Sequence, residues 1–118
     1  KPEVLVRSAL HRAGFRFRLY TSGLPGRPDI VLPKHGVVIF VHGCFWHRHG
    51  CPLSSEPRTR RKFWNEKFAR NVARDARNAR ALRRLGWRVL TVWECALRTK
   101  PSRERAIAGL VRKITRSA

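Results

Sequence analysis

The sequence predicts a single mixed α/β domain with a central mixed sheet flanked by helices. Three observations lead to this fold class. Apolar residues recur at helical spacing in three segments, short apolar or alternating runs lie between them, and no linker, repeat or low-complexity tract interrupts the 118 residues. A chain of this length suits one domain with a modest core, to which a structural metal would add stability. We therefore expect residues 1–118 to form one domain.

The first half of the chain predicts one helix followed by three strands. Residues 2–13 should be helical, because Pro2 suits a first turn, apolar side chains recur at helical spacing and Gly14 ends the pattern. The continuously apolar run Val37–Val41 is typical of a strand at the centre of a sheet. The predicted strands, separated by turns and a Gly/Pro-rich loop, are 15–20, 29–32 and 37–41.

The second half predicts a long helix, a strand and a final helix. The long helix should cover residues 59–85, with arginines on its polar faces and Gly86 as its C-terminal stop. Its apolar stripe consists of Phe68, Val72, Ala79, Leu82 and Leu85. A strand over 87–93, a turn over 94–97 and a basic helix over 101–116 should follow.

The composition is strongly basic, since 27 Lys and Arg against 7 Asp and Glu give a formal net charge of +20. Such a charge destabilises the compact state by self-repulsion, so we expect a polyanionic partner such as DNA, RNA or a membrane surface. No apolar stretch is long enough to span a bilayer, and no apolar signal region begins the chain. The odd number of cysteines, 3, favours metal-bound thiols in a reducing compartment over a disulfide framework. We therefore expect a cytoplasmic protein.

Residues 42–51 concentrate histidines, cysteines and aromatic side chains in one predicted loop. Three of them are spaced to ligate a tetrahedral metal, and a cysteine at the end of the last predicted strand offers a fourth ligand. The expected ligands of a structural zinc are Cys44, His49, Cys51 and Cys95. Spacing alone leaves three alternatives open: His42 or His47 in place of His49, a catalytic zinc with an open position, and cysteines that are simply buried apolar residues.

Carboxylates and histidines near the central strand are candidates for catalysis. Asp29 opens a strand beside it, where a carboxylate can hold Mg²⁺ together with phosphate and water; the alternative is an ordinary turn aspartate. His42 and His47 follow the central strand and can take a proton from a water nucleophile, or they are surface residues or spare zinc ligands. Glu3 and Asp75 can orient a histidine or simply stabilise their own helices.

Aromatic residues beside cations indicate contact with nucleic-acid bases. Phe45 and Trp46 lie between the candidate zinc ligands, and Trp64 begins the long helix among arginines and a lysine. Flat side chains in such surroundings can wedge between bases while the cations hold phosphates. The alternatives are that Phe45 and Trp46 cover the zinc loop and that Trp64 belongs to the helix core. Trp87 and Trp93 are expected in the sheet core.

Several motifs combine in one order along about residues 1–100. They are Lys1–Glu3, Leu24–Asp29 (LPGRPD), Val38–His47 (VIFVHGCFWH), Asn71–Asp75 (NVARD), Gly86–Leu90 (GWRVL) and Val92–Leu97 (VWECAL). The most specific part is HGCFWH followed by HxC and a distant WEC. In this combination the chain closely resembles the very-short-patch repair (Vsr) DNA mismatch endonucleases.

The resemblance implies a fold like that of type II restriction endonucleases and the nicking of one DNA strand beside a T·G mismatch left by deaminated methylcytosine. It implies that Asp29 binds catalytic Mg²⁺ together with the backbone carbonyl of Val41. His47 would be the general base, His42 would assist at the phosphate, and Glu3 and Asp75 would support them. Cys44, His49, Cys51 and Cys95 match the family's structural zinc ligands, and Phe45, Trp46 and Trp64 match its intercalating aromatics.

Position 41 departs from the family, which often has threonine there; a main-chain ligand survives the change to Val41. We also expect that an N-terminal segment that contacts DNA in the family is missing from this sequence.

The predicted partners are duplex DNA with a T·G mismatch and a mismatch-repair mediator, bound by a monomer associated with the bacterial nucleoid. The alternative functions are a catalytically silent zinc-stabilised DNA-binding module and a nickase of broader mismatch specificity.

Overall fold

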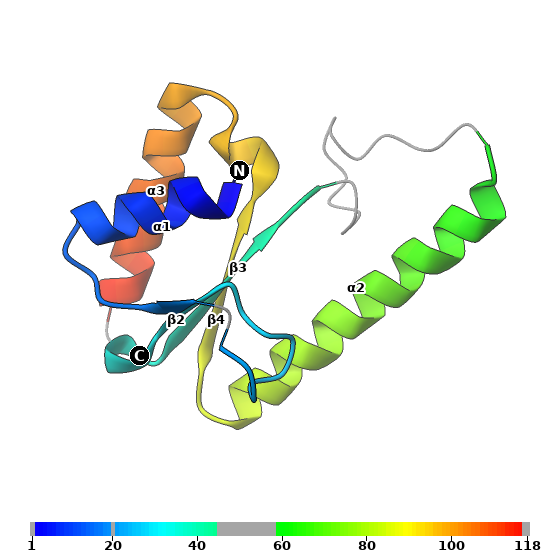
Figure 1. Cartoon of the computed structure of the whole chain (residues 1–118), viewed down its shortest axis with the longest axis horizontal. Helices are drawn as coiled ribbons and strands as arrows, with labels where there is room; N and C mark the ends of the chain where they lie inside the picture. Colours follow the sequence, from blue (N-terminus) through cyan, green and yellow to red (C-terminus); the bar gives the residue numbers. More distant parts are fainter. Residues whose placement is uncertain (1, 20, 45–58, 117–118) are drawn as a thin grey trace.

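The computed structural model describes residues 2–19, 21–44 and 59–116 and has α/β architecture (Figure 1). Its helices are α1 (Pro2–Arg12), α2 (Arg61–Arg84) and α3 (Lys100–Thr115), with short 3-10 turns η1 (Pro33–His35) and η2 (Glu94–Leu97). Its strands are β1 (Arg18–Leu19), β2 (Ile30–Leu32), β3 (Val37–His42) and β4 (Arg88–Trp93). No helix in the described ranges is long and apolar enough to cross a membrane.

The four strands form one mixed sheet in the order β1-β2-β3-β4. The pairs β1/β2 and β2/β3 are antiparallel, and β3 pairs in parallel with β4. A parallel pair needs a long crossover, which here contains α2. The register sets Val37 against Arg88 and His42 against Trp93, so that β3 and β4 end at the same edge of the sheet.

One face of the sheet is covered by α1 and α3 (Figure 1). Because side chains alternate across a strand, Val37 and Ile39 of β3 point to this face and pack with apolar residues of both helices. The fully buried cluster consists of Val6, Leu10, Ile30, Leu32, Val37, Ile39, Val92, Leu97, Leu110 and Ile114. This face therefore holds most of the hydrophobic core.

The opposite face is covered in part by α2, whose C-terminal turns lie against the sheet while its N-terminal part extends away (Figure 1). Leu82 of α2 packs with Val31 and Val38 in a second, smaller cluster. The helix ends at Arg84 and is followed by Gly86, where φ is +95°; the Trp87 N–H then donates to the Leu82 carbonyl oxygen at 3.1 Å. This C-terminal motif turns the chain directly into β4.

Most of the predicted elements are confirmed, with two corrections. Among residues 15–19, the described part of the predicted strand 15–20, pairing is limited to Arg18–Leu19, because Phe15 and Phe17 pack against the α1/α3 core without joining the sheet. The stripe of the long helix is not uniformly buried. Phe68 and Leu82 are buried, whereas Val72 is 45% exposed and Leu85 is 62% exposed. Val72 lines the open cleft, and Leu85 follows the last helical residue, Arg84.

Candidate active site

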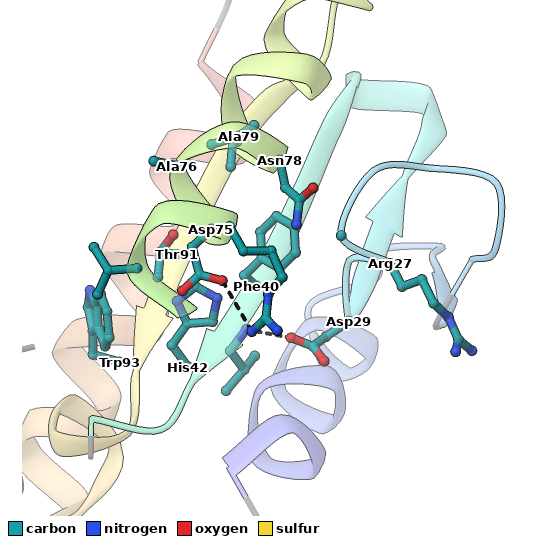
Figure 2. Close-up of a pocket in the computed structure, with 15 residues that line it drawn as sticks. Arg27, Asp29, Phe40, His42, Asp75, Ala76, Asn78, Ala79, Thr91 and Trp93 are labelled. Atoms are coloured by element: carbon teal, nitrogen blue, oxygen red, sulfur yellow. Dashed lines mark hydrogen bonds and ion pairs between the residues drawn. The ribbon is translucent and has the colours of Figure 1, made fainter. Parts of the chain in front are cut away.

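An open cleft of about 900 Å³ lies between α2 and the sheet, where the helix diverges from the sheet (Figure 2). Its floor includes Phe40 and His42 of β3 and Thr91 and Trp93 of β4. Asp29 borders it from the start of β2, and side chains of the middle of α2 form the facing wall. The cleft thus lies beside the edge at which β3 and β4 end.

Asp29 is held at this edge by a backbone contact. The antiparallel pairing of β2 with β3 ends at Ile30 opposite Ile39, so main-chain pairing does not extend to Val41. The side chain of Asp29 replaces it, because its Oδ2 accepts a hydrogen bond of 2.7 Å from the Val41 N–H. The two residues for which the family resemblance implies a shared metal are therefore in direct contact.

The loop before Asp29 is fixed against α2. The Arg27 N–H donates to the Leu24 carbonyl oxygen at 3.1 Å, which closes a turn. Gly26, in the same turn, has φ of +76°, and a Cβ built there would lie 3.0 Å from the Cβ of Asn78. The glycine therefore allows both the backbone conformation and the close approach of the helix that bring Asp29 to the cleft.

His42 is the last residue of β3 and lines the cleft. Its ring lies between two aromatic neighbours, with centroid distances of 5.5 Å to Phe40 and 5.2 Å to Trp93 in an edge-on arrangement. These contacts fix the imidazole at the end of the strand. Trp93 is half-buried and lines the cleft, which corrects the prediction that it belongs to the sheet core, whereas Trp87 packs against the smaller cluster.

Asp75 reaches the cleft from α2, and Figure 2 shows Asp29, His42 and Asp75 around one space, contributed by the loop before β2, by β3 and by α2. Its side chain is 25% exposed and forms an ion pair with Arg74, with 3.9 Å between Nη2 and Oδ1. Arg74 also lines the cleft. Sequence reasoning placed Arg74 among the polar-face arginines of the long helix and missed this position.

The remaining predicted catalytic residues are divided. Glu3 lies in the first turn of α1, the helix on the opposite face of the sheet, and is not among the described residues that line the cleft. His47 lies outside the described residues. The structure therefore brings together Asp29, Val41, His42 and Asp75 from three separate segments.

Two of the predicted zinc ligands are described. Cys44 is fully buried just after β3, and Cys95 is half-buried just after β4, so the parallel register brings both to one edge of the sheet. Glu94 joins these segments, since its Oε1 accepts a hydrogen bond of 3.2 Å from the Cys44 N–H. His49 and Cys51 lie outside the described residues. Within those residues, no three His, Cys, Asp or Glu side chains gather closely enough to hold a metal.

Of the three predicted intercalating residues, Trp64 is described, whereas Phe45 and Trp46 lie outside the described ranges. Trp64 is half-buried in the part of α2 that extends from the sheet. Its ring stacks on Phe68 at a centroid distance of 5.8 Å and meets Phe63 edge-on at 5.3 Å. The ammonium group of Lys67 lies 5.8 Å from its centroid. The indole therefore packs against side chains of its own helix, and a lysine ammonium group lies near its ring.

The cleft joins two carboxylates and a histidine in a strongly basic α/β domain. Carboxylates that can hold a metal, a group able to move protons and a positive surface that attracts a polyanion are the features of a nuclease.

Comparison with known proteins identifies the family. A family model described as "DNA mismatch endonuclease Vsr" matches residues 1–53. The chain is 53% identical over 97 residues to the type II nicking enzyme V.XorIIP of Xanthomonas oryzae pv. oryzae, covering 82% of this chain and 71% of that relative. It is 44% identical over 114 residues to the type II nicking enzyme V.NmeAIP of Neisseria meningitidis serogroup A, covering 97% of this chain and 81% of that relative.

The DNA mismatch endonuclease Vsr of Escherichia coli is 53% identical to the chain over 96 residues, which is 81% of this chain. The aligned part is 62% of the E. coli enzyme, so the chain spans less than two thirds of that relative. The chain belongs to the Vsr family of DNA mismatch endonucleases. This confirms the resemblance and makes the protein a DNA nicking enzyme by class.

Proposed function

We propose that this protein is a Mg²⁺-dependent endonuclease that nicks one strand of duplex DNA beside a T·G mismatch. The observation that carries the proposal is the contact between Asp29 and Val41 at the border of a cleft that also contains His42 and Asp75. Membership of a family of mismatch endonucleases and nicking enzymes supports the same reaction. A fold of the restriction-endonuclease type is consistent with the mixed sheet and its covering helices.

The residues at this border fit a magnesium ion. Mg²⁺ is bound in proteins by one or two carboxylates with water and substrate phosphate, rather than by a closed cage of side chains. The Val41 N–H points to the Asp29 side of β3, and the carbonyl of a strand residue points to the same side as its N–H. Asp29 and the Val41 carbonyl would therefore hold the ion. When bound, it stabilises negative charge on the reacting oxygens.

The protons of the reaction would be moved by histidine. His42 is at the cleft and would hold a proton near a phosphate oxygen, while His47, beyond the described residues, is proposed as the general base on the family resemblance. Asp75 would orient a histidine from the α2 wall. Glu3 is proposed as a second supporting carboxylate and would act from the α1 side of the sheet.

A structural zinc would brace the segment after β3. The fit rests on two thiols, Cys44 and Cys95, at one edge of the sheet, and on the hydrogen bond from Cys44 to Glu94 that ties the same segments together. His49 and Cys51 would complete a tetrahedral site. Elemental analysis should then give about one zinc per purified chain, and zinc removal should lower the thermal midpoint. A zinc content near zero would remove this assignment.

DNA recognition would combine charge with deformation. Trp64, together with Phe45 and Trp46, would wedge between base pairs, at a cost of a few kcal/mol that is lowest at a weakly stacked mismatch. The net charge of +20 would add affinity that does not depend on sequence. We propose a monomer that works in the bacterial cytoplasm at the nucleoid, with a mismatch-repair mediator as a further partner.

The test is a cleavage panel on end-labelled duplexes that contain T·G, each other mismatch, or C·G at one position. With Mg²⁺ we expect one nick, in the strand that carries the mismatched T, and no cleavage of the C·G duplex or in EDTA. Tight binding without scission under any divalent ion would instead indicate a silent binding module. Equal nicking at several mismatches would indicate a broader nickase and contradict the T·G assignment.

A further inference from the structure

The α2 wall of the cleft carries a cation that the proposed mechanism does not use. Arg74 lines the cleft, its side chain is 55% exposed, and its guanidinium forms an ion pair with the carboxylate of Asp75. We propose that Arg74 is a catalytic phosphate-binding residue, whose guanidinium contacts the scissile phosphate and stabilises the charge that develops there. This inference rests on the proposed nicking activity and deepens it.

The side chain of Arg74 is directed toward the cleft. Adjacent residues on a helix point about 100° apart and do not normally face each other. Asp75 points into the cleft, and the long side chain of Arg74 bends round the helix so that its Nη2 lies 3.9 Å from Asp75 Oδ1. The dashed line that ends on Asp75 in Figure 2 marks this ion pair. The guanidinium is thereby placed at the rim of the cleft.

The ion pair between Arg74 and Asp75 is long. A separation of 3.9 Å exceeds the roughly 2.7–3.2 Å of an N–H···O hydrogen bond, so this contact does not engage the N–H donors of Arg74. The guanidinium presents a planar set of donors that matches two phosphate oxygens. A guanidinium that is 55% exposed, and whose contact with Asp75 leaves its N–H donors available, is suited to receive a ligand from solvent.

The cleft contains both carboxylates and arginines. Asp29 and Asp75 both border it and would repel an incoming phosphate. Among the described cleft residues the arginines are Arg27 and Arg74, and Figure 2 shows the Arg27 side chain extending away from Asp29, His42 and Asp75. Arg74 is therefore the arginine placed to offset this repulsion. Because phosphodiester hydrolysis adds negative charge at phosphorus, a fixed donor there favours the transition state over bound substrate.

Arg77 of the same helix provides a matched control. It is exposed, does not line the cleft, and at 3.6 residues per turn it lies about 200° round the helix from Asp75. Arg74→Ala and Arg77→Ala remove the same charge from positions about 60° apart round α2, of which Arg74 lines the cleft and Arg77 does not. Arg74→Lys keeps the charge but removes the planar pair of donors.

The experiment measures single-turnover nicking of a T·G duplex with Mg²⁺ at saturating enzyme, with Asp29→Ala as the inactive reference. We expect Arg74→Ala to slow nicking about 10²-fold and Arg74→Lys about tenfold, with Arg77→Ala within about twofold of wild type. Thermal midpoints and the saturating enzyme concentration should stay similar in all three variants. If Arg74→Ala matches Arg77→Ala, or if Arg74→Lys nicks like wild type, the inference is overturned. Failure of the wild-type enzyme to nick would instead overturn the proposed function.

Discussion

The two faces of the sheet differ in how they are covered. The α1/α3 face buries 10 apolar residues in one cluster, whereas the cluster on the α2 face has 3 and leaves an open cleft beside it. Strand β3 serves both faces, with Val37 and Ile39 in the larger core and Phe40 and His42 at the cleft. Apolar packing is therefore concentrated on one side of the sheet, which leaves the other side free to carry polar groups.

The closely packed α1/α3 face and the α2 face with its cleft require different residues on the helices that cover them. Helices α1 and α3 need apolar residues that meet the sheet, such as Leu10 and Leu110. Helix α2 touches the sheet mainly through Leu82, and its middle turns present Asp75 and Asn78 to the cleft. We therefore expect substitutions on the α1/α3 face to change folding, and substitutions at the cleft to change the reaction.

The largest effect on activity among residues of the cleft floor should come from His42. Replacing it with Asn removes the titratable ring but keeps a polar side chain at the end of β3. Single-turnover nicking should fall by about 10²- to 10⁴-fold, the usual contribution of a positioned proton carrier. The thermal midpoint should change by no more than a few degrees, because the site lies outside both hydrophobic clusters. Nicking at the wild-type rate would show that His42 carries no proton.

A pair of truncations compares the two faces in stability. Leu110 on α3 is 5% exposed and Val72 on α2 is 45% exposed. Leu110→Ala should lower the free energy of unfolding by about 2–5 kcal/mol, whereas Val72→Ala should change it by no more than about 0.5 kcal/mol. Urea denaturation of both variants measures the difference. Similar losses would mean that the α2 face contributes to the core as much as the α1/α3 face does.

A glycine pair separates backbone strain from contact with α2. Gly23 and Gly26 both have positive φ, +89° and +76°, but a Cβ at Gly23 meets nothing within 4 Å while one at Gly26 meets Asn78 at 3.0 Å. Both alanine variants should be destabilised by about 1–3 kcal/mol, with Gly26→Ala the more affected. Gly26→Ala should also slow nicking, because the loop leads to Asp29. If the two variants lose equal stability and activity, the contact with Asn78 does not position the loop.

The smallest effect concerns the far end of the α1/α3 face. Arg88 of β4 donates from Nη1 to the Lys113 carbonyl at 2.7 Å and from Nη2 to the Ile114 carbonyl at 2.8 Å, which caps the C-terminal turn of α3. Arg88→Ala should lower the free energy of unfolding by about 1–2 kcal/mol, and Arg88→Lys by less because the charge remains. Nicking at saturating enzyme should be unchanged. A clear loss of rate would mean that the two faces are coupled.

Sequence periodicity was sufficient for the elements and for the α1/α3 core, because the pattern of Val6, Leu10, Leu110 and Ile114 is local. It failed for Val72 and Leu85, since a local pattern shows neither that Val72 lines an open cleft nor that the helix ends at Arg84, before Leu85. It also missed Arg74, because neighbours on a helix are not expected to share a face. The bond from Cys44 to Glu94 joins residues 50 apart in sequence, and no local pattern predicts it. The specific catalytic roles were predicted from the family resemblance, because periodicity does not assign them.

The most direct test of the cleft as the catalytic site is a Mg²⁺ titration of single-turnover nicking on a T·G duplex, with wild type and Asp29→Asn compared at equal folded fraction. Asparagine keeps an oxygen that can accept the Val41 N–H but removes the charge that would hold the metal. We predict Mg²⁺-dependent nicking by wild type and a rate about 10³-fold lower for Asp29→Asn, equivalent to about 4 kcal/mol. Nicking by Asp29→Asn at the wild-type rate and with the same dependence on Mg²⁺ would contradict the account.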